Sequence, residues 1–98
     1  MVTVLTTQAF DVWFAALADK QARVRIQVRI DRLEHGNVGD WKPVGAGVSE
    51  LRIDHGPGYR VYFVRRGQEV VILLAGGDKS SQARDIKMAQ RLAAAWEK

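Results

Sequence analysis

The sequence predicts an α+β domain whose elements follow one another in the order β-α-α-β-β-β-α. Three observations support this prediction. Apolar residues recur every three or four positions in the first third of the chain and again near its end, which is typical of helices. Between Leu51 and Ala75 they alternate or run continuously, which is typical of strands. The length of 98 residues fits one hydrophobic core and leaves no room for a second, so we expect a single domain over residues 1–98.

The N-terminal part of the chain predicts a strand and two helices. Val2–Leu5 is a short β-prone segment, and the hydroxyl of Thr6 or Thr7 can cap the helix that follows. Asp19 can cap a second helix, and Gly36 can end it. The apolar stripes are formed by Phe10, Trp13, Phe14 and Leu17 in the first helix and by Ala22, Ile26, Ile30 and Leu33 in the second. The short link between the helices predicts a helical hairpin, which we expect to cover one face of the sheet.

The second predicted helix is also rich in arginine. Val24 and Val28 widen its apolar stripe. Much of its remaining surface is occupied by Arg23, Arg25, Arg29 and Arg32. Two interpretations stay open: these arginines bind the phosphates of RNA, or they form a solvated face with acidic neighbours such as Asp31 and Glu34.

The middle of the chain predicts a loop and then strands. Residues 37–47 are loop-like because they contain several glycines and a proline. Leu51 and Ile53 alternate with polar residues, which indicates a half-buried strand, and residues 55–58 form a turn. A second strand runs from Tyr59 to Arg65 and places Arg60, Tyr62 and Val64 on one face.

The last third predicts a central strand and a final helix. Residues 69–75 are apolar on both faces, which is typical of a strand covered on both sides, and Gly76 and Gly77 are expected to end it. Ser80 or Ser81 can cap the helix that follows. The apolar stripe of that helix is Ile86, Ala89, Leu92, Ala93 and Trp96. The three consecutive strands should form an antiparallel meander, and the first strand should join one side of it.

Composition and charge narrow the classes of function. The chain has 0 cysteines, which excludes disulfide scaffolds, thiol nucleophiles and cysteine-based metal sites. The apolar run Val70–Ala75 is far shorter than the roughly 20 residues of a membrane span, and no basic segment precedes Asp11 as in a signal peptide. We therefore expect a cytoplasmic protein without a membrane partner. A net charge of +4 and a pI of about 9.9 favour a polyanionic partner without identifying it as nucleic acid.

Three segments of the chain resemble a known family. Residues 50–53 (Glu-Leu-Arg-Ile) and 58–63 (Gly-Tyr-Arg-Val-Tyr-Phe) are similar to strands of the RelE/ParE superfamily of bacterial toxins. Residues 74–82 (Leu-Ala-Gly-Gly-Asp-Lys-Ser-Ser-Gln), followed by Asp85-Ile86, are similar to its HigB-like "addiction module killer" branch. The resemblance covers essentially the whole chain. It implies a RelE-like fold with a small, mainly antiparallel sheet, the N-terminal helical hairpin on one face, and a C-terminal helix.

Members of this family are toxins of type II toxin–antitoxin pairs. The resemblance therefore implies ribosome-dependent endonucleolytic cleavage of mRNA, without a metal or an organic cofactor. It also implies a co-encoded antitoxin, often of the helix-turn-helix type. The toxin would bind operator DNA only through this antitoxin. Two alternatives stay open: a ParE-like inhibitor that binds DNA gyrase and catalyses nothing, and an inactive homologue that acts as an antitoxin-bound co-repressor.

Three basic residues are candidates for phosphate binding. Metal-free RNA cleavage needs a base for the 2′-hydroxyl, cations for the charge that develops on the phosphate, and an acid for the leaving 5′-oxygen. Arg52 and Arg60 project from adjacent strands and could grip one phosphate if the register brings them together. The resemblance assigns this role to Arg60, and it assigns a basic role to Lys79, which follows the third strand. A simpler interpretation is that each arginine is solvated or paired with Glu50 or Asp54.

Two further residues are candidates for substrate binding. His55 has an imidazole suited to general base catalysis, although a polar residue is expected in its turn anyway. Tyr62 could stack on a base, although packing in the sheet also explains it. Some ribonuclease members of the family carry a tyrosine or histidine on the last helix, where this chain has Ile86. That difference leaves Asp78 or Asp85 as the remaining acid–base groups and favours the non-nuclease alternatives.

Two further expectations concern the burial of the tryptophans and the effect of replacing Arg60. Trp13 and Trp96 lie on apolar stripes and should be substantially buried, whereas Trp41 lies in the predicted loop and should be more exposed. Replacing Arg60 by alanine should remove most of the toxicity while leaving the fold largely intact.

Overall fold

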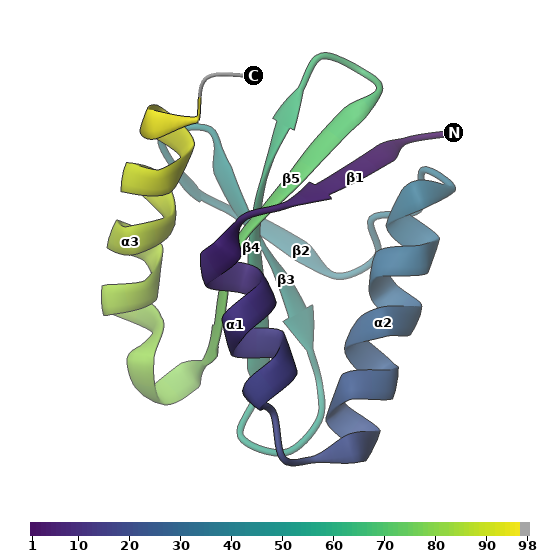
Figure 1. Ribbon diagram of the computed structural model, residues 1–98, viewed down its shortest axis with the longest axis vertical. Helices are drawn as coiled ribbons and strands as arrows, with labels where there is room; N and C mark the ends of the chain where they lie inside the picture. Colours follow the sequence, from purple (N-terminus) through teal and green to yellow (C-terminus); the bar gives the residue numbers. More distant parts are fainter. Residues whose placement is uncertain (97–98) are drawn as a thin grey trace.

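A five-stranded sheet with helices on both faces forms the framework of the protein (Figure 1). The computed structural model describes residues 1–96. Its elements are, in chain order, β1 (Thr3–Thr6), α1 (Gln8–Ala16), α2 (Lys20–Glu34), β2 (Trp41–Gly45), β3 (Val48–Ile53), β4 (Tyr59–Arg66), β5 (Val70–Asp78), the short 3-10 helix η1 (Lys79–Ser81) and α3 (Gln82–Ala95).

The strands lie in the order β1-β5-β4-β3-β2. The strands β2 to β5 form an antiparallel meander, and β1 pairs with β5 in parallel. The central place of β5, between β1 and β4, confirms the prediction from its apolar residues on both faces. The predicted attachment of the first strand to one side of the meander is also confirmed.

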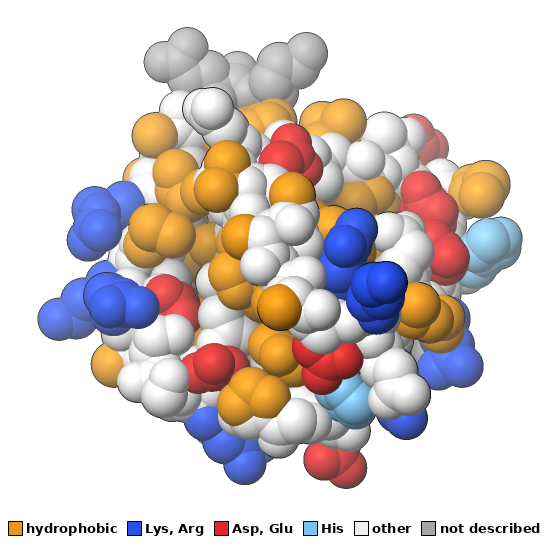
Figure 2. Space-filling view, turned by 60° about the horizontal axis from the view of Figure 1, so that its bottom comes forward, with side chains coloured by type: hydrophobic (Ala, Val, Ile, Leu, Met, Phe, Trp, Pro, Cys, Tyr) orange, Lys and Arg blue, Asp and Glu red, His pale blue; other side chains and the backbone are white. Residues whose placement is uncertain are grey.

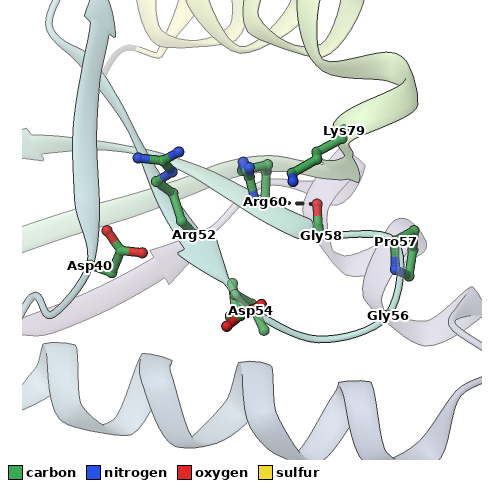
Figure 3. A pocket seen from close by; sticks show the side chains of 9 residues that line it. Asp40, Arg52, Asp54, Gly56, Pro57, Gly58, Arg60 and Lys79 are labelled. Carbon is green, nitrogen blue, oxygen red and sulfur yellow. Dashed lines mark hydrogen bonds between the residues drawn. The ribbon is translucent and has the colours of Figure 1, made fainter.

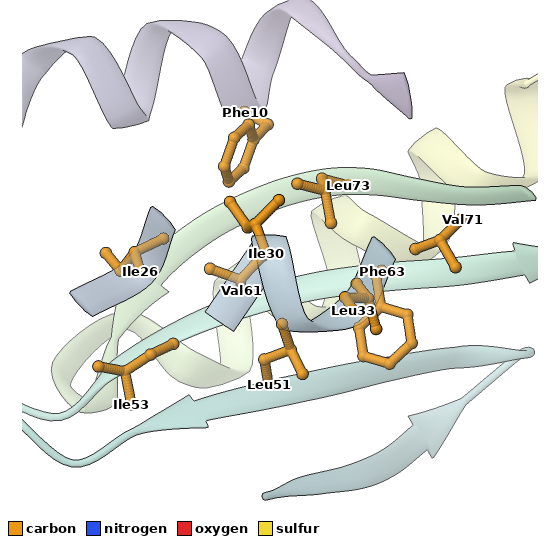
Figure 4. Packing of buried hydrophobic residues seen from close by; sticks show 10 residues of the cluster. All are labelled: Phe10, Ile26, Ile30, Leu33, Leu51, Ile53, Val61, Phe63, Val71 and Leu73. Atoms are coloured by element: carbon orange, nitrogen blue, oxygen red, sulfur yellow. The ribbon is translucent and has the colours of Figure 1, made fainter. Parts of the chain in front are cut away.

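Each face of the sheet has its own hydrophobic core, because successive residues of a strand point to opposite faces. A register shift between β4 and β5 interrupts this alternation and places both Leu74 and Ala75 in the core under α3. The core under α1 and α2 (Figure 4) consists of Phe10, Ile26, Ile30, Leu33, Leu51, Ile53, Val61, Phe63, Val71 and Leu73. The core under α3 consists of Val48, Tyr62, Val64, Ile72, Leu74, Ala75, Ala89 and Ala93. The prediction that the two N-terminal helices cover the same face is therefore confirmed.

The helix starts follow the expected capping chemistry in part. The Thr7 hydroxyl accepts a hydrogen bond from Phe10 N (3.1 Å), and the Asp19 carboxylate accepts one from Ala22 N (3.1 Å). At the start of α3, Ser81 makes no such cap. Its hydroxyl instead donates to Asp85 Oδ2 (2.5 Å).

Residues 41–45 form the strand β2, so the prediction of a loop over residues 37–47 is wrong there. Trp41 and Lys42 pair with Leu51 and Glu50 of β3, and Pro43 is tolerated because β2 is an edge strand. Two of the glycines that suggested a loop, Gly45 and Gly47, serve the turn between β2 and β3. Gly45, Ala46 and Gly47 have φ angles of 99°, 55° and 78°.

Strand β5 continues through Gly76 and Gly77, so the prediction that these glycines end it is also wrong. A Cβ on Gly76 would lie 2.1 Å from the Trp13 ring, and a Cβ on Gly77 would lie 1.9 Å from Asp85 Oδ2. The two glycines therefore let side chains of α1 and α3 approach the backbone of the sheet closely.

The tryptophans follow the expectation in part. Trp41 is 45% exposed, as expected, whereas Trp13 and Trp96 are only half-buried at the edges of the two cores. Within residues 1–96, no helix is long and apolar enough to cross a membrane.

Candidate functional site

The strand register places the two candidate arginines directly opposite each other. Arg52 of β3 pairs with Arg60 of β4, and Glu50 pairs with Tyr62. These residues occupy the face of the sheet that α3 covers. The alternation in β4 predicted that Arg60 and Tyr62 share a face, and it left open which helix covers that face. The condition on which the phosphate-binding hypothesis depended, a register that brings Arg52 and Arg60 together, is therefore met.

A pocket of about 380 Å³ lies where β3 ends and β4 begins. It is lined by Asp40, Arg52, Ile53, Asp54, Gly56, Pro57, Gly58, Arg60 and Lys79. Figure 3 shows Arg52, Arg60 and Lys79 along one side of it, with Asp40 and Asp54 below them in the view. The three predicted cations thus share one open cavity, although they come from β3, β4 and the segment after β5.

Arg60 is buried, with 5% of its surface exposed. Its Nη1 donates hydrogen bonds to the carbonyl oxygens of Gly58 (3.3 Å) and Tyr59 (3.1 Å), and its Nε lies 3.8 Å from Glu50 Oε2. Burial of a guanidinium is costly unless it is paired. Arg60 is therefore part of the fold as well as part of the pocket, which argues against the expectation that its removal leaves the fold intact.

Glu50 is the partner of both arginines. Its Oε2 lies 3.7 Å from the Nε of Arg52, and its Oε1 accepts a hydrogen bond from Gln82 Nε2 (2.9 Å). The side chain of Arg52 remains 42% exposed at the pocket. The ion pairs with Glu50, which were the simpler interpretation of the two arginines, are thus present. Both arginines nevertheless line the pocket.

Lys79 lies at the rim, in η1. Gly58 has φ +81°, and a Cβ on it would lie 3.0 Å from Lys79 Cε, so the lysine stem runs over this glycine. The preceding Asp78 caps η1, and hydrogen bonds from the hydroxyl and backbone N–H of Ser80 lower the pKa of its carboxyl. The turn that carries Lys79 is therefore held by the hydrogen bonds between Asp78 and Ser80 and by the packing of the lysine stem on Gly58.

The structure does not bring His55 or Tyr62 into the pocket. His55 Nε2 lies 3.1 Å from Asp19 Oδ2 at the start of α2, and His55 is not a lining residue. Tyr62 is 0% exposed, so its ring cannot stack on a base and the interpretation as packing in the sheet is confirmed. Burial, together with the nearby carboxylates of Glu50 and Asp85, raises the pKa of the Tyr62 phenol.

The other acid–base candidates also lie outside the pocket lining. Asp85 is buried against Gly77 and accepts the Ser81 hydroxyl, and Asp78 holds Ser80. The carboxylates that do line the pocket are those of Asp40 and Asp54. Sequence reasoning missed Asp40 because the segment around it was interpreted as a loop, and it treated Asp54 only as an ion-pair partner.

Arg29 supports the rim of the pocket from α2. Its Nη1 donates to the carbonyl oxygen of Arg52 (2.6 Å), and its Nη2 donates to that of Asp40 (2.9 Å). Burial lowers the pKa of its guanidinium. Grouping Arg29 with the surface arginines of α2 was therefore wrong. Gly39 leaves room for this contact, since a Cβ there would lie 3.1 Å from Arg29 Nη2.

The remaining surface of α2 combines charge and apolar groups. Val24 is 63% exposed and Val28 is 39% exposed. Val24 lines surface grooves together with Lys20, Arg23 and Arg25. Figure 2 shows Lys and Arg side chains in separate groups among acidic and hydrophobic ones, so the positive charge does not form one continuous surface on the face seen there.

Comparisons with known proteins show that most of the chain matches a known sequence family. Residues 12–94 match the model of the family described as "Phage derived protein Gp49-like (DUF891)". A protein of Haemophilus influenzae with the name "Uncharacterized protein" is 50% identical over 92 residues, which cover 94% of this chain and 93% of that protein. The range matched by the family includes every residue that lines the pocket.

Proposed function

Because the chain belongs to the Phage derived protein Gp49-like family, we propose that it is the toxin of a type II toxin–antitoxin pair and inhibits translation by cleaving mRNA on the ribosome. The resemblance of β3, β4 and the end of β5 to RelE/ParE toxins supports this proposal. The observation that carries it is the meeting of Arg52, Arg60 and Lys79 in one open pocket. Three cations around one cavity suit a phosphate whose negative charge grows in the transition state.

In the proposed reaction, the 2′-oxygen of a ribose attacks the adjacent phosphorus. The bond from phosphorus to the 5′-oxygen breaks, and a 2′,3′-cyclic phosphate and a free 5′-hydroxyl result. The 2′-hydroxyl proton passes to a base, and the leaving 5′-oxygen takes a proton from water. The guanidiniums of Arg52 and Arg60 bind the non-bridging phosphate oxygens, and the Lys79 ammonium adds a point charge at the rim.

The carboxylates of Asp40 and Asp54 are the acid–base groups that the pocket offers for the 2′-hydroxyl proton. Such a limited set suits an enzyme whose substrate is oriented by the ribosome, because positioning alone can supply much of the rate enhancement. Asp54→Asn should therefore lower the cleavage rate in the translating system without weakening association with the ribosome.

We also propose that a co-encoded antitoxin, of the helix-turn-helix type, binds this chain and connects it to operator DNA. The exposed Val24 and Val28 of α2 lie among basic side chains, which fits an acidic partner segment with apolar anchors. Association with such a partner should be fast and sensitive to salt.

A second candidate function is favoured by one observation. Among the described residues that line the pocket there is no imidazole or phenol. A ParE-like inhibitor of DNA gyrase needs no acid–base residue, so the same basic pocket could contact gyrase instead of RNA.

Three measurements separate the two functions. Purified protein is added to a reconstituted translation system with a reporter mRNA, and cleavage is mapped by primer extension with and without ribosomes. The proposed function predicts cuts within codons that require ribosomes and that disappear in Arg52→Ala. Growth arrest on induction without any mRNA cleavage, together with loss of supercoiling by purified gyrase, would replace it with the gyrase function.

A further inference from the structure

A carboxylate is buried between the two arginines of the pocket. Glu50 is 1% exposed, lies two residues before Arg52 on β3 and is diagonal to Arg60 on β4. Its Oε2 lies 3.7 Å from Arg52 Nε and 3.8 Å from Arg60 Nε. Its Oε1 is held by Gln82 of α3 at 2.9 Å. One carboxylate therefore contacts both guanidiniums, in each case at the nitrogen nearest the side-chain stem.

Without this carboxylate the two guanidiniums would repel each other. Like charges directly opposite on neighbouring strands destabilise the pair, and Arg52 and Arg60 occupy such positions. The burial of Glu50 and Arg60 strengthens their attraction, because little water screens these two charges, whereas Arg52 pairs with the same carboxylate from the open side of the pocket. The carboxylate thus allows two positive groups to share one side of a small pocket.

Contact at Nε leaves the outer nitrogens for a ligand. Arg60 Nη1 donates to backbone carbonyl oxygens. Within residues 1–96, no hydrogen bond engages Arg60 Nη2 or the Nη atoms of Arg52. Glu50 itself does not line the pocket, so it can act on a ligand only through the arginines.

We propose that Glu50 is the positioning residue of the arginine pair, which it aligns so that Arg60 Nη2 and the Nη atoms of Arg52 bind the same phosphate. This inference rests on the proposed function, since it concerns the cations that would bind the scissile phosphate. Gln82 is the second member of the arrangement, because it fixes the carboxylate from the start of α3.

The first test is the cleavage kinetics of Glu50→Gln, with Glu69→Gln as the matched control. Both substitutions remove one negative charge, and Glu69 is exposed in the turn between β4 and β5, outside the pocket lining. In Glu50→Gln, kcat should fall by about tenfold or more while KM stays unchanged or decreases, since the pocket gains positive charge but loses alignment. Glu69→Gln should match the wild type. Gln82→Ala, which changes no charge, should lower kcat by about threefold, again without raising KM.

The second test does not depend on cleavage. Inorganic phosphate is titrated into the protein while the Nε–H signals of Arg52 and Arg60 are followed by NMR. In the wild type both signals should shift together with one affinity, and in Glu50→Gln they should shift separately. If the wild type cleaves no RNA but shows the coupled shifts, the proposed function fails and this inference stands.

Two results would overturn the inference. The first is a folded Glu50→Gln protein with kcat within twofold of the wild type and coupled phosphate shifts. The second is a wild type whose two Nε–H signals do not respond to phosphate together. If Glu50→Gln does not fold, Gln82→Ala decides by the same measurements, and an unchanged kcat with coupled shifts in that variant rejects the role of Glu50.

Discussion

Alanine substitutions of Arg52 and Arg60 should have different effects on folding, because the two side chains differ in burial. The Arg52 side chain is 42% exposed, whereas that of Arg60 is 6% exposed. Loss of Arg52 leaves Glu50 in contact with Arg60 and Gln82, and it should reduce the free energy of unfolding by roughly 0–1 kcal/mol, as for an exposed ion pair. Loss of Arg60 removes a buried partner and should cost about 3–5 kcal/mol. That is a large part of the roughly 5–15 kcal/mol that stabilises a domain of this kind.

The effect on activity should be similar for both variants. Each removes one guanidinium from the phosphate, which should raise the barrier by about 2.7–4 kcal/mol, or slow cleavage by roughly two to three orders of magnitude. Arg52→Ala is therefore the variant that separates catalysis from folding. Arg60→Lys keeps the positive charge but not the planar fork, so it should restore activity only in part.

The assay combines urea denaturation with ribosome-dependent cleavage of a reporter mRNA. Arg65→Ala is the matched control, since Arg65 is an exposed arginine of β4 outside the pocket lining and should be silent in both measurements. A folded Arg52→Ala protein that cleaves within about threefold of the wild-type rate would refute the phosphate-binding role. An Arg60→Ala protein as stable as the wild type would refute the argument from burial.

Three further predictions concern packing, pH and the partner. Gly76→Ala should lower the free energy of unfolding in urea by about 1–3 kcal/mol or more, because its Cβ would lie 2.1 Å from the Trp13 ring; unchanged stability would contradict this packing. The hydrogen bond from Ala22 N–H lowers the pKa of Asp19 in the folded state, so its stabilising contribution is present above pH about 4 and is lost as the pH falls below it. Asp19→Asn should flatten that part of a plot of unfolding free energy against pH. Val24→Asp should weaken binding of the antitoxin by about tenfold or more in calorimetry and leave mRNA cleavage unchanged; equal affinity would exclude this surface of α2.

Local patterns were sufficient for several elements. Thr7 and Asp19 cap their helices because a short polar side chain can reach a backbone N–H three residues on. The alternation in β4 correctly placed Arg60, Tyr62 and Val64 on one face, because the period of a strand does not depend on its neighbours. The apolar run of β5 was correctly interpreted as a central strand, because a strand that is apolar on both faces must be covered on both sides.

The errors concern residues whose conformation depends on distant partners. β2 is a strand because the backbone of β3 pairs with it. The residues around Pro43 have no pattern that predicts this pairing. Gly76 and Gly77 were interpreted as a strand end because glycine disfavours strands. In the folded protein they accommodate Trp13 and Asp85, which lie on different helices.

The sequence by itself determined the α+β class and the faces of the residues in β3 and β4, and it suggested three basic residues as candidates for phosphate binding. Only the tertiary structure decided that Arg52 lies opposite Arg60, that Lys79 reaches the same pocket, and that Glu50 lies buried between the arginines. The physical reason is that periodicity and capping depend on neighbours along the chain. Register, burial and the sharing of one carboxylate by two guanidiniums depend instead on segments that meet only when the sheet and α3 pack together.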